Sequence, residues 1–436
     1  MNFYSTNSPS IQVPFKEAVF NSLPQDGGLY MPVSIPKLSD EFIKNLDKYT
    51  LPEIAFEVAK NILAGSIPEK DLKAIIDDAI NFDAPVVKLE EGVYVLELFH
   101  GPSLAFKDFG ARFMSRVMSY FLRDGEKMLD ILVATSGDTG GAVALGFLGV
   151  PNTRVTILYP KGKVSPIQEQ QLTTNGQNIR AIEVDGTFDD CQALVKAAFV
   201  DDALNAKFRL TSANSINIAR LIPQTFYYFN AYAQLLRLGK SEVVFSVPSG
   251  NFGNIGAGIL AYKMGLPVKQ FLAATNANDT VPEYLETGVY QPKPSVATLS
   301  NAMDVGAPSN WVRISHLFGD KLGDLQQLIT GYSYTDEETL ESINAAFVTY
   351  SYIICPHTAI AWRALQEWQF KHNDSKATGV FLSTAHPCKF PEVFSPEISA
   401  KIVVPASVLE MEGKPSLSVP LGKDFEGFKA YLLANA

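Results

Sequence analysis

One stretch of the sequence places a lysine where its amine could do chemistry. It runs Phe99-His100-Gly101-Pro102-Ser103-Leu104-Ala105-Phe106-Lys107-Asp108-Phe109-Gly110, between a strand-like run at 93–99 and a helix-like run that starts near Asp108. Apolar neighbours would exclude water from the Lys107 ammonium, which lowers its pKa and frees a neutral amine that can attack an aldehyde. The alternative is a solvent-exposed lysine at a helix start, which is the ordinary state of a lysine.

A glycine-rich turn further along the chain could bind an anion. It comprises Gly250, Asn251, Phe252, Gly253 and Asn254, between a strand-like run at 242–247 and a helix-like run. Small residues expose backbone N–H groups, and a helix N-terminus adds positive potential, so we expect a phosphate there rather than a bare turn. Residues 256–261 also match the dinucleotide pattern GxGxxA, but those glycines lie inside the helical pattern and no acidic residue ends the next strand.

Polar and cationic side chains follow several other predicted strands. They are Ser136 and Thr139 after strand 130–134, Lys161 after strand 154–159, and Asn214 and Arg220 after the strand at 209–211. Ammonium, guanidinium, amide and hydroxyl groups together could bind an oxyanion. A solvated charged edge is the alternative for each of the cations.

A further apolar strand, near residue 380, ends at Thr384 and His386, and His357 opens another helical run. We expect both histidines to be structural, because no carboxylate or cysteine stands at metal-ligand spacing beside them. The sequence therefore predicts neither a metal site nor a Ser/His/Asp triad.

From residue 93 onward, short apolar strands alternate with helices, which is typical of α/β folds with open, mostly parallel sheets. Two such series predict two lobes. We expect a mostly helical N-terminal domain at 1–92, a unit at 93–240 with the lysine segment and a smaller lobe at about 130–215, and a larger lobe at 241–436 with the anion-binding turn. Ligands lie beyond the carboxyl ends of strands in such sheets, which is where the polar turns fall.

Composition narrows the possible partners. Asp and Glu number 46 against 36 Lys and Arg, so nothing argues for nucleic acid. The three cysteines, Cys191, Cys355 and Cys388, are widely spaced, which fits a reducing cytoplasm. We expect no signal peptide and no membrane association, because no apolar run approaches spanning length.

A desolvated lysine, a phosphate-binding turn and a strand-end hydroxyl together suit pyridoxal 5'-phosphate. Lys107 would join the aldehyde as a Schiff base, the Gly250–Asn254 turn would hold the phosphate, and Thr384 would face the pyridine nitrogen.

Six segments in the same order closely resemble the threonine synthases, within the fold-type II (tryptophan synthase β-like) pyridoxal phosphate enzymes. They are residues 23–32, 100–110, 134–141, 249–254, 301–311 and 383–390. The resemblance implies a carbon–oxygen lyase that converts O-phospho-L-homoserine and water to L-threonine and phosphate, by γ-elimination and β-addition of water, in the last step of threonine biosynthesis. It also implies a monomer of the longer bacterial and fungal kind.

The resemblance assigns Lys107 the proton transfers at Cα and Cβ. We expect Lys161 to be the first cation for the substrate phosphate, with Ser136, Thr139, Asn214 and Arg220 as further substrate-binding groups. Members of the wider group often carry an asparagine that bonds the cofactor's phenolic oxygen where this chain has Asp138. Because a carboxylate would repel a phenolate, we expect Asp138 to cap the following helix or to be protonated.

Three other functions stay open at this point. A related pyridoxal phosphate dehydratase or phosphohomoserine lyase would share Lys107 and the phosphate-binding turn but release a keto acid. A nicotinamide dehydrogenase would use residues 256–261. A cofactor-binding protein that has lost catalysis would serve as a scaffold.

Overall fold

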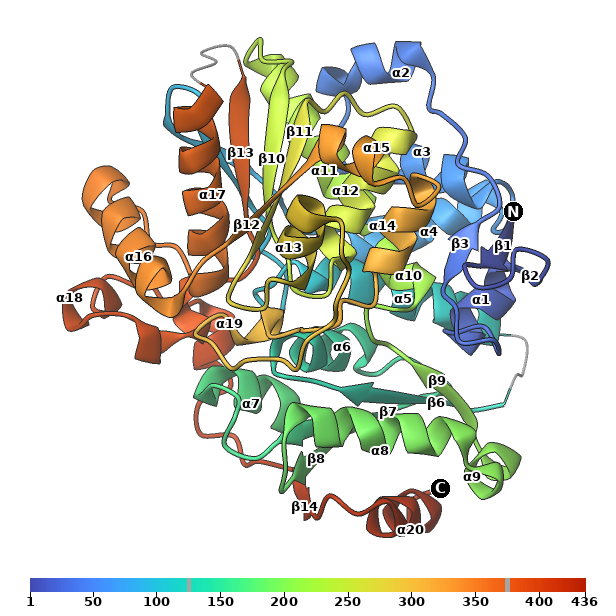
Figure 1. Cartoon of the computed structure of the whole chain (residues 1–436). Coiled ribbons are helices and arrows are strands. Elements are labelled where there is room, and N and C mark those ends of the chain that lie inside the picture. The colour runs from blue at the N-terminus through green and yellow to red at the C-terminus, as the bar shows by residue number, and fades with distance from the viewer. Residues whose placement is uncertain (124–126, 373–376) are drawn as a thin grey trace.

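The computed structural model describes residues 1–123, 127–372 and 377–436 of the chain. Two separate parallel-rich sheets form two lobes, and the N-terminal region packs beside the larger lobe (Figure 1). This arrangement confirms the predicted fold class.

The larger sheet contains, in spatial order, β12 (Ile329–Ser333), β11 (Gln270–Thr275), β10 (Val243–Pro248), β13 (Thr378–Ser383), β5 (Val93–Glu97) and β4 (Val86–Glu90). Its strands pair in parallel, except that β4 runs antiparallel to β5. Successive side chains point to opposite faces. Phe245 belongs to the core under α11 (Gln224–Arg237) and α12 (Gly253–Lys263), whereas Val244 belongs to the core under α16 (Asp336–Tyr350) and α17 (Pro356–His372).

The smaller sheet contains, in spatial order, β14 (Val419–Leu421), β8 (Ile179–Val184), β7 (Thr153–Pro160), β6 (Leu129–Ala134) and β9 (Arg209–Ser212), all parallel. On its inner face, Val133 packs in the core shared with α5 (Lys107–Leu122) and α6 (Asp138–Phe147). On its outer face, Leu132 packs with α8 (Phe188–Val200) and α20 (Phe425–Ala434). Because both faces are largely buried, the strands are rich in apolar residues on both faces, which is why the sequence reveals them.

The sheet pairing departs from the expected boundaries at two places. Strand β4 falls inside the expected N-terminal domain but extends the larger sheet. Strand β14 and helix α20 fall inside the expected larger lobe but complete the smaller sheet and cover its outer face. The apolar outer face and the free edge of β8 need cover, and the C-terminal segment supplies it with Phe428 and Leu432.

The N-terminal region adds a small antiparallel sheet that the sequence did not reveal, in the order β2 (Gln12–Pro14), β1 (Asn2–Ser5) and β3 (Tyr30–Pro32). Its helices are α1 (Phe15–Asn21), α2 (Asp40–Lys44), α3 (Leu51–Leu63) and α4 (Glu69–Ala79), with η1 (Leu46–Lys48). Helix α3 packs on α11, and α4 packs on α5. The region therefore supports the helix that begins with Lys107.

The remaining helices connect or flank these layers. They are α7 (Pro166–Thr173), α9 (Asp202–Lys207), α10 (Ile218–Leu221), α13 (Thr280–Thr287), η2 (Asn301–Met303), α14 (Trp311–Leu317), α15 (Leu322–Leu328), η3 (Pro387–Lys389), η4 (Pro391–Val393), α18 (Pro396–Ser399) and α19 (Ala406–Leu409). Helices α10 and α11 are separated at Pro223, which lacks the N–H that a helix interior needs.

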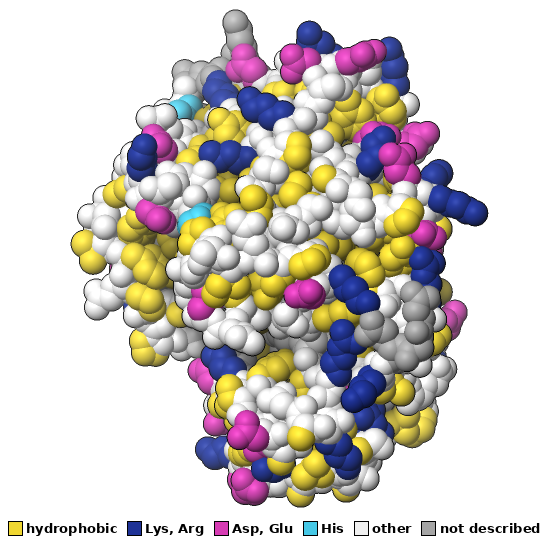
Figure 2. All heavy atoms as spheres, turned by 90° about the vertical axis from the view of Figure 1, so that its right-hand side faces the viewer, with side chains coloured by type: hydrophobic (Ala, Val, Ile, Leu, Met, Phe, Trp, Pro, Cys, Tyr) yellow, Lys and Arg dark blue, Asp and Glu magenta, His cyan; other side chains and the backbone are white. Residues whose placement is uncertain are grey.

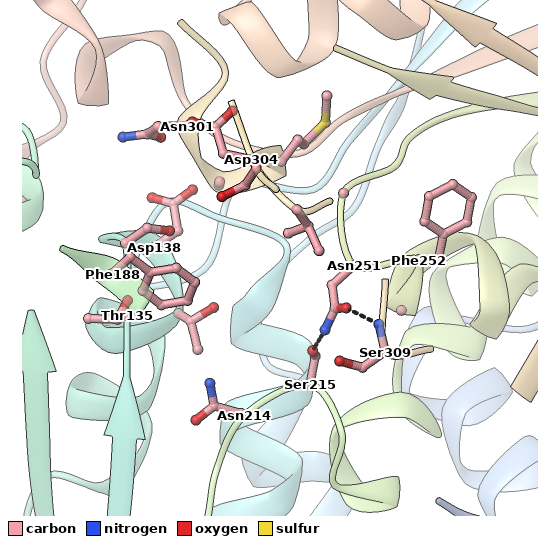
Figure 3. A pocket seen from close by; sticks show the side chains of 18 of the residues that line it. Thr135, Asp138, Phe188, Asn214, Ser215, Asn251, Phe252, Asn301, Asp304 and Ser309 are labelled. Atoms are coloured by element: carbon pink, nitrogen blue, oxygen red, sulfur yellow. Dashed lines mark hydrogen bonds between the residues drawn. The ribbon is translucent and has the colours of Figure 1, made fainter. Parts of the chain in front are cut away.

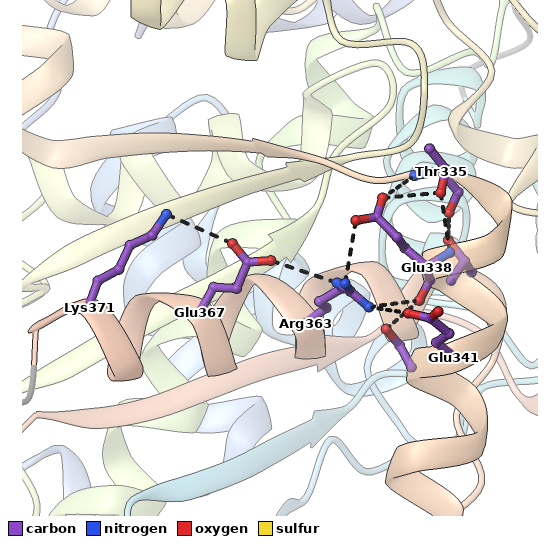
Figure 4. Close-up of polar contacts among 8 residues, drawn as sticks. Thr335, Glu338, Glu341, Arg363, Glu367 and Lys371 are labelled. Atoms are coloured by element: carbon purple, nitrogen blue, oxygen red, sulfur yellow. Dashed lines mark hydrogen bonds and ion pairs between the residues drawn. The ribbon is translucent and has the colours of Figure 1, made fainter.

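Helices α16 and α17 are joined by surface ion pairs centred on Arg363 (Figure 4). Its guanidinium lies 3.4 Å from Glu338, 3.2 Å from Glu341 and 3.7 Å from Glu367. Glu338 also closes the capping box with Thr335 at the start of α16. Exposed pairs contribute little singly, but this network links α17 to α16.

In space-filling view the smaller lobe is the narrower end of the molecule, and basic, acidic and apolar side chains are mixed over the face shown (Figure 2). No helix in the described part of the chain combines the length and apolar composition of a membrane span.

Candidate active site

Lys107 is the first residue of α5, and the turn before it is tied to the end of β13. Phe106 N donates to the carbonyl of Thr384 at 2.9 Å, and Ala105 forms an antiparallel bridge with Ala385. The two strand-end segments are therefore held side by side. Lys107 and Thr384 line the same cavity, as the sequence predicts.

That cavity has a volume of about 390 Å³ and lies between the lobes. Figure 3 shows Thr135, Asp138 and Phe188 on one side of it and Asn251 and Ser309 on the other. All but one of the residues proposed from the sequence as site residues line it: Lys107, Ser136, Thr139, Asn214, Arg220, Gly250, Asn251, Phe252, Gly253, Asn254 and Thr384. The exception is Lys161, which lies exposed beyond β7 and outside the described lining of the cavity.

The Lys107 side chain is desolvated, with only 15% of its surface exposed. Burial lowers the pKa of its amine to about 8; the Asp138 carboxylate opposes this shift, and the cations Lys389 and Arg220 reinforce it. Its amine therefore loses a proton far more readily than that of an exposed lysine, which is the property the sequence predicts for a nucleophile.

Asp138 does not behave as expected: it neither caps a helix nor takes up a proton. The N-cap of α6 is Gly137, and Oγ1 of Thr135, not the Asp138 carboxylate, accepts from an N–H of the first turn, that of Gly140 at 2.8 Å. Oδ1 of Asp138 lies 2.7 Å from Nζ of Lys389 and accepts from Gln168 at 3.0 Å, while Oδ2 lies 3.9 Å from Nζ of Lys107. Burial raises the pKa of Asp138, but the ammonium groups of Lys389 and Lys107 outweigh it and hold that pKa below its ordinary value.

The glycine-rich turn leads into α12 with its N-terminal N–H groups unoccupied by a side-chain cap. Phe252 holds the N-cap position in the left-handed region, at φ 59°. A Cβ at Gly250 would lie 2.5 Å from the Cα of Met303, so only glycine fits beneath the loop that covers the turn. The first N–H groups of a helix have no acceptor within it, so this end favours an anion.

The side chain of Asn251 is occupied elsewhere. Its Nδ2 donates to Ser215 at 2.6 Å, and its Oδ1 accepts from Ser309 N at 2.6 Å (Figure 3). Asn251 thus joins two loops of the cavity, and only its backbone is left to face an anion.

Two tyrosines fix the amide of Asn254, a residue that lines the cavity, so that its oxygen is bonded and its nitrogen is left without a partner among the described residues. The hydroxyl of Tyr227 lies 2.6 Å from Oδ1 of Asn254, and that of Tyr228 lies 2.8 Å from it. These distances are typical of O–H···O bonds and shorter than most N–H···O bonds. Nδ2 is buried, and none of the described residues accepts from it. Such a group costs free energy unless a ligand satisfies it.

Both histidines have the structural surroundings that the sequence predicts. Burial lowers the pKa of each to about 4. Nε2 of His357 accepts from Ala302 N at 3.2 Å, and Nδ1 of His386 accepts from Cys388 N at 3.2 Å. Each neutral ring thus orders a nearby turn, and His357 also lines the cavity.

Sequence reasoning missed several residues of the site. In the sequence, Tyr227 and Tyr228 look like ordinary core aromatic residues of a helix. Lys389 follows a predicted strand end, and no residue close to it in the sequence indicates what it pairs with. Residues 301–306 line the cavity and lie within one of the six segments that carry the resemblance, which was the available signal for them. Lys196 and Lys293 also line it and had no sequence signal.

Comparison with known families matches the chain along almost its whole length. The family of pyridoxal-phosphate dependent enzymes matches residues 81–384, the threonine synthase N terminus matches residues 2–80, and the threonine synthase C-terminal region matches residues 358–432. The chain belongs to the threonine synthase family.

Individual members of that family are similar over their full length. Threonine synthase of Haemophilus influenzae is 46% identical over 435 residues, covering 100% of both chains, and that of Escherichia coli is 44% identical over 433 residues, covering 99% of both. The crystal structure of the Escherichia coli enzyme superposes with a TM-score of 0.92, at 43% identity and 100% coverage of both chains. A PLP-bound threonine synthase from Brucella melitensis superposes with a TM-score of 0.92, at 33% identity and coverage of 99% and 98%.

The residues of the cavity fit pyridoxal phosphate, the cofactor of the threonine synthase family. The desolvated Lys107 amine suits the aldehyde, and the neutral hydroxyl of Thr384 suits a ring nitrogen. The uncapped start of α12 and the unpartnered, buried Nδ2 of Asn254 suit the phosphate. Membership of this family rules out the nicotinamide dehydrogenase.

Proposed function

We propose that this chain converts O-phospho-L-homoserine and water to L-threonine and phosphate. The observation that carries the proposal is one cavity in which the desolvated Lys107 amine and the uncapped start of α12 face the same space between two lobes. The full-length similarity to threonine synthases supports it.

Lys107 would bond the cofactor aldehyde and then, once released, carry protons at Cα and Cβ of the substrate. Its lowered pKa suits an amine that must both accept and donate a proton near neutral pH. Pyridoxal phosphate, when bound, supplies an electron sink for negative charge that develops on the substrate carbons. The backbone of Gly250–Asn254 and the Asn254 amide would hold its phosphate, and Thr384 would face its ring nitrogen.

The substrate's anionic groups need donors on the opposite side of the cavity. Ser136 and Thr139 at the start of α6 and Asn214 and Arg220 after β9 all line it. The Arg220 guanidinium is buried and donates to the Ala213 carbonyl, while its Nε has no acceptor among the described residues. We assign the binding of the substrate to these four residues and leave out Lys161.

Product analysis tests this function directly. The protein, loaded with pyridoxal phosphate and given O-phospho-L-homoserine, should release phosphate and L-threonine in equal amounts. Phosphate released together with 2-oxobutyrate would instead identify a phosphohomoserine lyase, and absence of turnover would identify a cofactor-binding scaffold. A monomeric state and a cytoplasmic location remain predictions; light scattering and cell fractionation test them.

A further inference from the structure

A second lysine, Lys389, contacts the cavity-lining residue Asp138 without any exposure to solvent. It ends η3, a short turn after β13 in the larger lobe. A lysine is almost never fully buried unless its charge is paired. The chain therefore holds an ammonium at this place against a large desolvation cost, and its partners should reveal why.

The ammonium of Lys389 connects the smaller lobe to the segment that precedes Lys107. It lies 2.7 Å from Oδ1 of Asp138 on α6 and donates to the Ser103 carbonyl at 2.9 Å. Both acceptors receive a second bond from α7, from Gln168 to Asp138 and from Gln171 to Ser103, each at 3.0 Å. Asp138 and Ser103 are thus fixed by neighbours on both lobes.

The charges around Lys107 form an ordered set. The Asp138 carboxylate lies between two ammonium groups, 2.7 Å from that of Lys389 and 3.9 Å from that of Lys107. The other charged or titratable groups that face these three are Arg220 on α10, His357 on α17, Asp108 on α5, Cys355 before α17, and His386 and Cys388 beside Lys389. With Lys389 in place, one negative charge is shared by two cations. Without Lys389, the carboxylate would have Lys107 as its nearest cation and would hold a proton on that amine.

We infer that Lys389 is a positioning residue: its ammonium fixes the Asp138 carboxylate beside Lys107 and neutralises it, so that the carboxylate does not hold a proton on the Lys107 amine. The inference rests on the proposed function only in the later role of the Lys107 amine, which is to bond the cofactor aldehyde and to carry protons. It also answers the difficulty at Asp138, because a carboxylate paired with Lys389 presents little net charge to a phenolic oxygen.

The test measures the proton affinity of Lys107 in the full-length chain freed of cofactor. Formaldehyde and cyanoborohydride methylate neutral amines, and mass spectrometry of the peptide that contains Lys107 gives the rate at each pH. The wild-type profile should have its midpoint near pH 8. Lys389→Met should raise the midpoint by about one pH unit, a roughly tenfold slower reaction at neutral pH, as expected for loss of one nearby cation.

Three further variants separate this role from a merely structural one. Asp138→Asn should lower the midpoint, and combining Asp138→Asn with Lys389→Met should bring it back toward the wild-type value. Lys161→Met, which removes an exposed lysine outside the cavity, should leave it unchanged. If Lys389→Met does not fold, the comparison of Asp138→Asn with the double variant still reports the effect of Lys389.

Two results would overturn the inference. One is a Lys389→Met protein that unfolds cooperatively but keeps the wild-type midpoint for methylation of Lys107. The other is a double variant whose midpoint is no closer to the wild-type midpoint than that of Lys389→Met. The methylation experiment involves no substrate and no turnover. A failed product assay would therefore leave its result standing, and an unchanged methylation midpoint would leave the proposed function standing.

Discussion

The hydroxyl of Tyr227 lies 2.6 Å from Oδ1 of Asn254, with the hydroxyl of Tyr228 at 2.8 Å from the same oxygen. These two tyrosines come from α11, a helix that supplies none of the residues to which we assign binding or catalysis. They nevertheless decide which end of the Asn254 amide is left without a protein partner. The orientation of the Asn254 amide in the phosphate-binding turn therefore depends on the tyrosine hydroxyls behind it.

Replacing both tyrosines by phenylalanine should weaken cofactor binding. The Asn254 amide would no longer be held with its donor toward the cavity, and its buried oxygen would lose both partners. Loss of one well-placed buried hydrogen bond costs about 1–2 kcal/mol, or roughly tenfold in affinity. Titration of the cofactor-free protein with pyridoxal phosphate, followed by absorbance, measures the effect.

Tyr232→Phe is the matched control. Tyr232 is buried on the same helix but does not bond to Asn254 in the structure. Removing its hydroxyl should leave the affinity for pyridoxal phosphate within about twofold, since that hydroxyl does not bond to the amide of Asn254. Equal losses in Tyr232→Phe and the double variant would show that α11 acts only through packing.

Asn214 and Lys161 should differ in their effect on substrate binding. Asn214 lines the cavity, whereas Lys161 is exposed beyond β7. Asn214→Ala removes an amide from the cavity and should raise KM for O-phospho-L-homoserine by about fivefold or more. Lys161→Ala should leave KM within about twofold. A larger rise in KM for Lys161→Ala would restore Lys161 to the role that the sequence suggested.

Asp108 should make the stability of the wild-type protein fall as pH rises. Its Oδ2 accepts from Ser103 N at 2.9 Å, but its buried Oδ1 has no donor among the described residues. Burial raises the pKa of Asp108 to about 6, above the value of an unfolded chain, so the folded state binds the proton more tightly. The stabilisation that this proton gives is present below about pH 4 and is lost as pH rises through 6.

Asp108→Asn, which stays neutral, should not show that loss. The free energy of unfolding of the variant, relative to wild type, should increase between pH 4 and pH 8 by roughly 2 kcal/mol, the equivalent of the pKa difference. Chemical unfolding at both pH values, at one cofactor concentration, measures it. A relative stability independent of pH would mean that Asp108 is not protonated in the folded chain.

The sequence predicts the fold and most of the cavity because both depend on local patterns. Strands such as 243–248, with the sequence Val-Val-Phe-Ser-Val-Pro, are buried on both faces and are therefore nearly continuous apolar runs. The turns at 134–141 and 249–254 follow such strands, and parallel strands bring their carboxyl ends to one edge. Lys107, Asn214 and Thr384 could be proposed together on that ground alone.

What escaped prediction depends on contacts between distant segments. Nothing near Lys389 in the sequence shows that it meets Asp138, so the expected fate of Asp138 was wrong: burial and charge pairing across the lobes decide it. The free edge of β8 likewise gives no local sign that β14 will occupy it. The exposed place of Lys161 could not be foreseen, because a cation after a strand looks the same in the sequence whether it turns toward the cavity or toward solvent.

The central claim is that the Lys107 amine holds pyridoxal phosphate covalently. Borohydride reduction of the loaded protein, followed by mass spectrometry of its peptides, tests it most directly. We predict one phosphopyridoxyl group per chain, on Lys107, and none in Lys107→Ala. A label on Lys389 or on any other lysine, or no label in protein that binds the cofactor, would contradict the account.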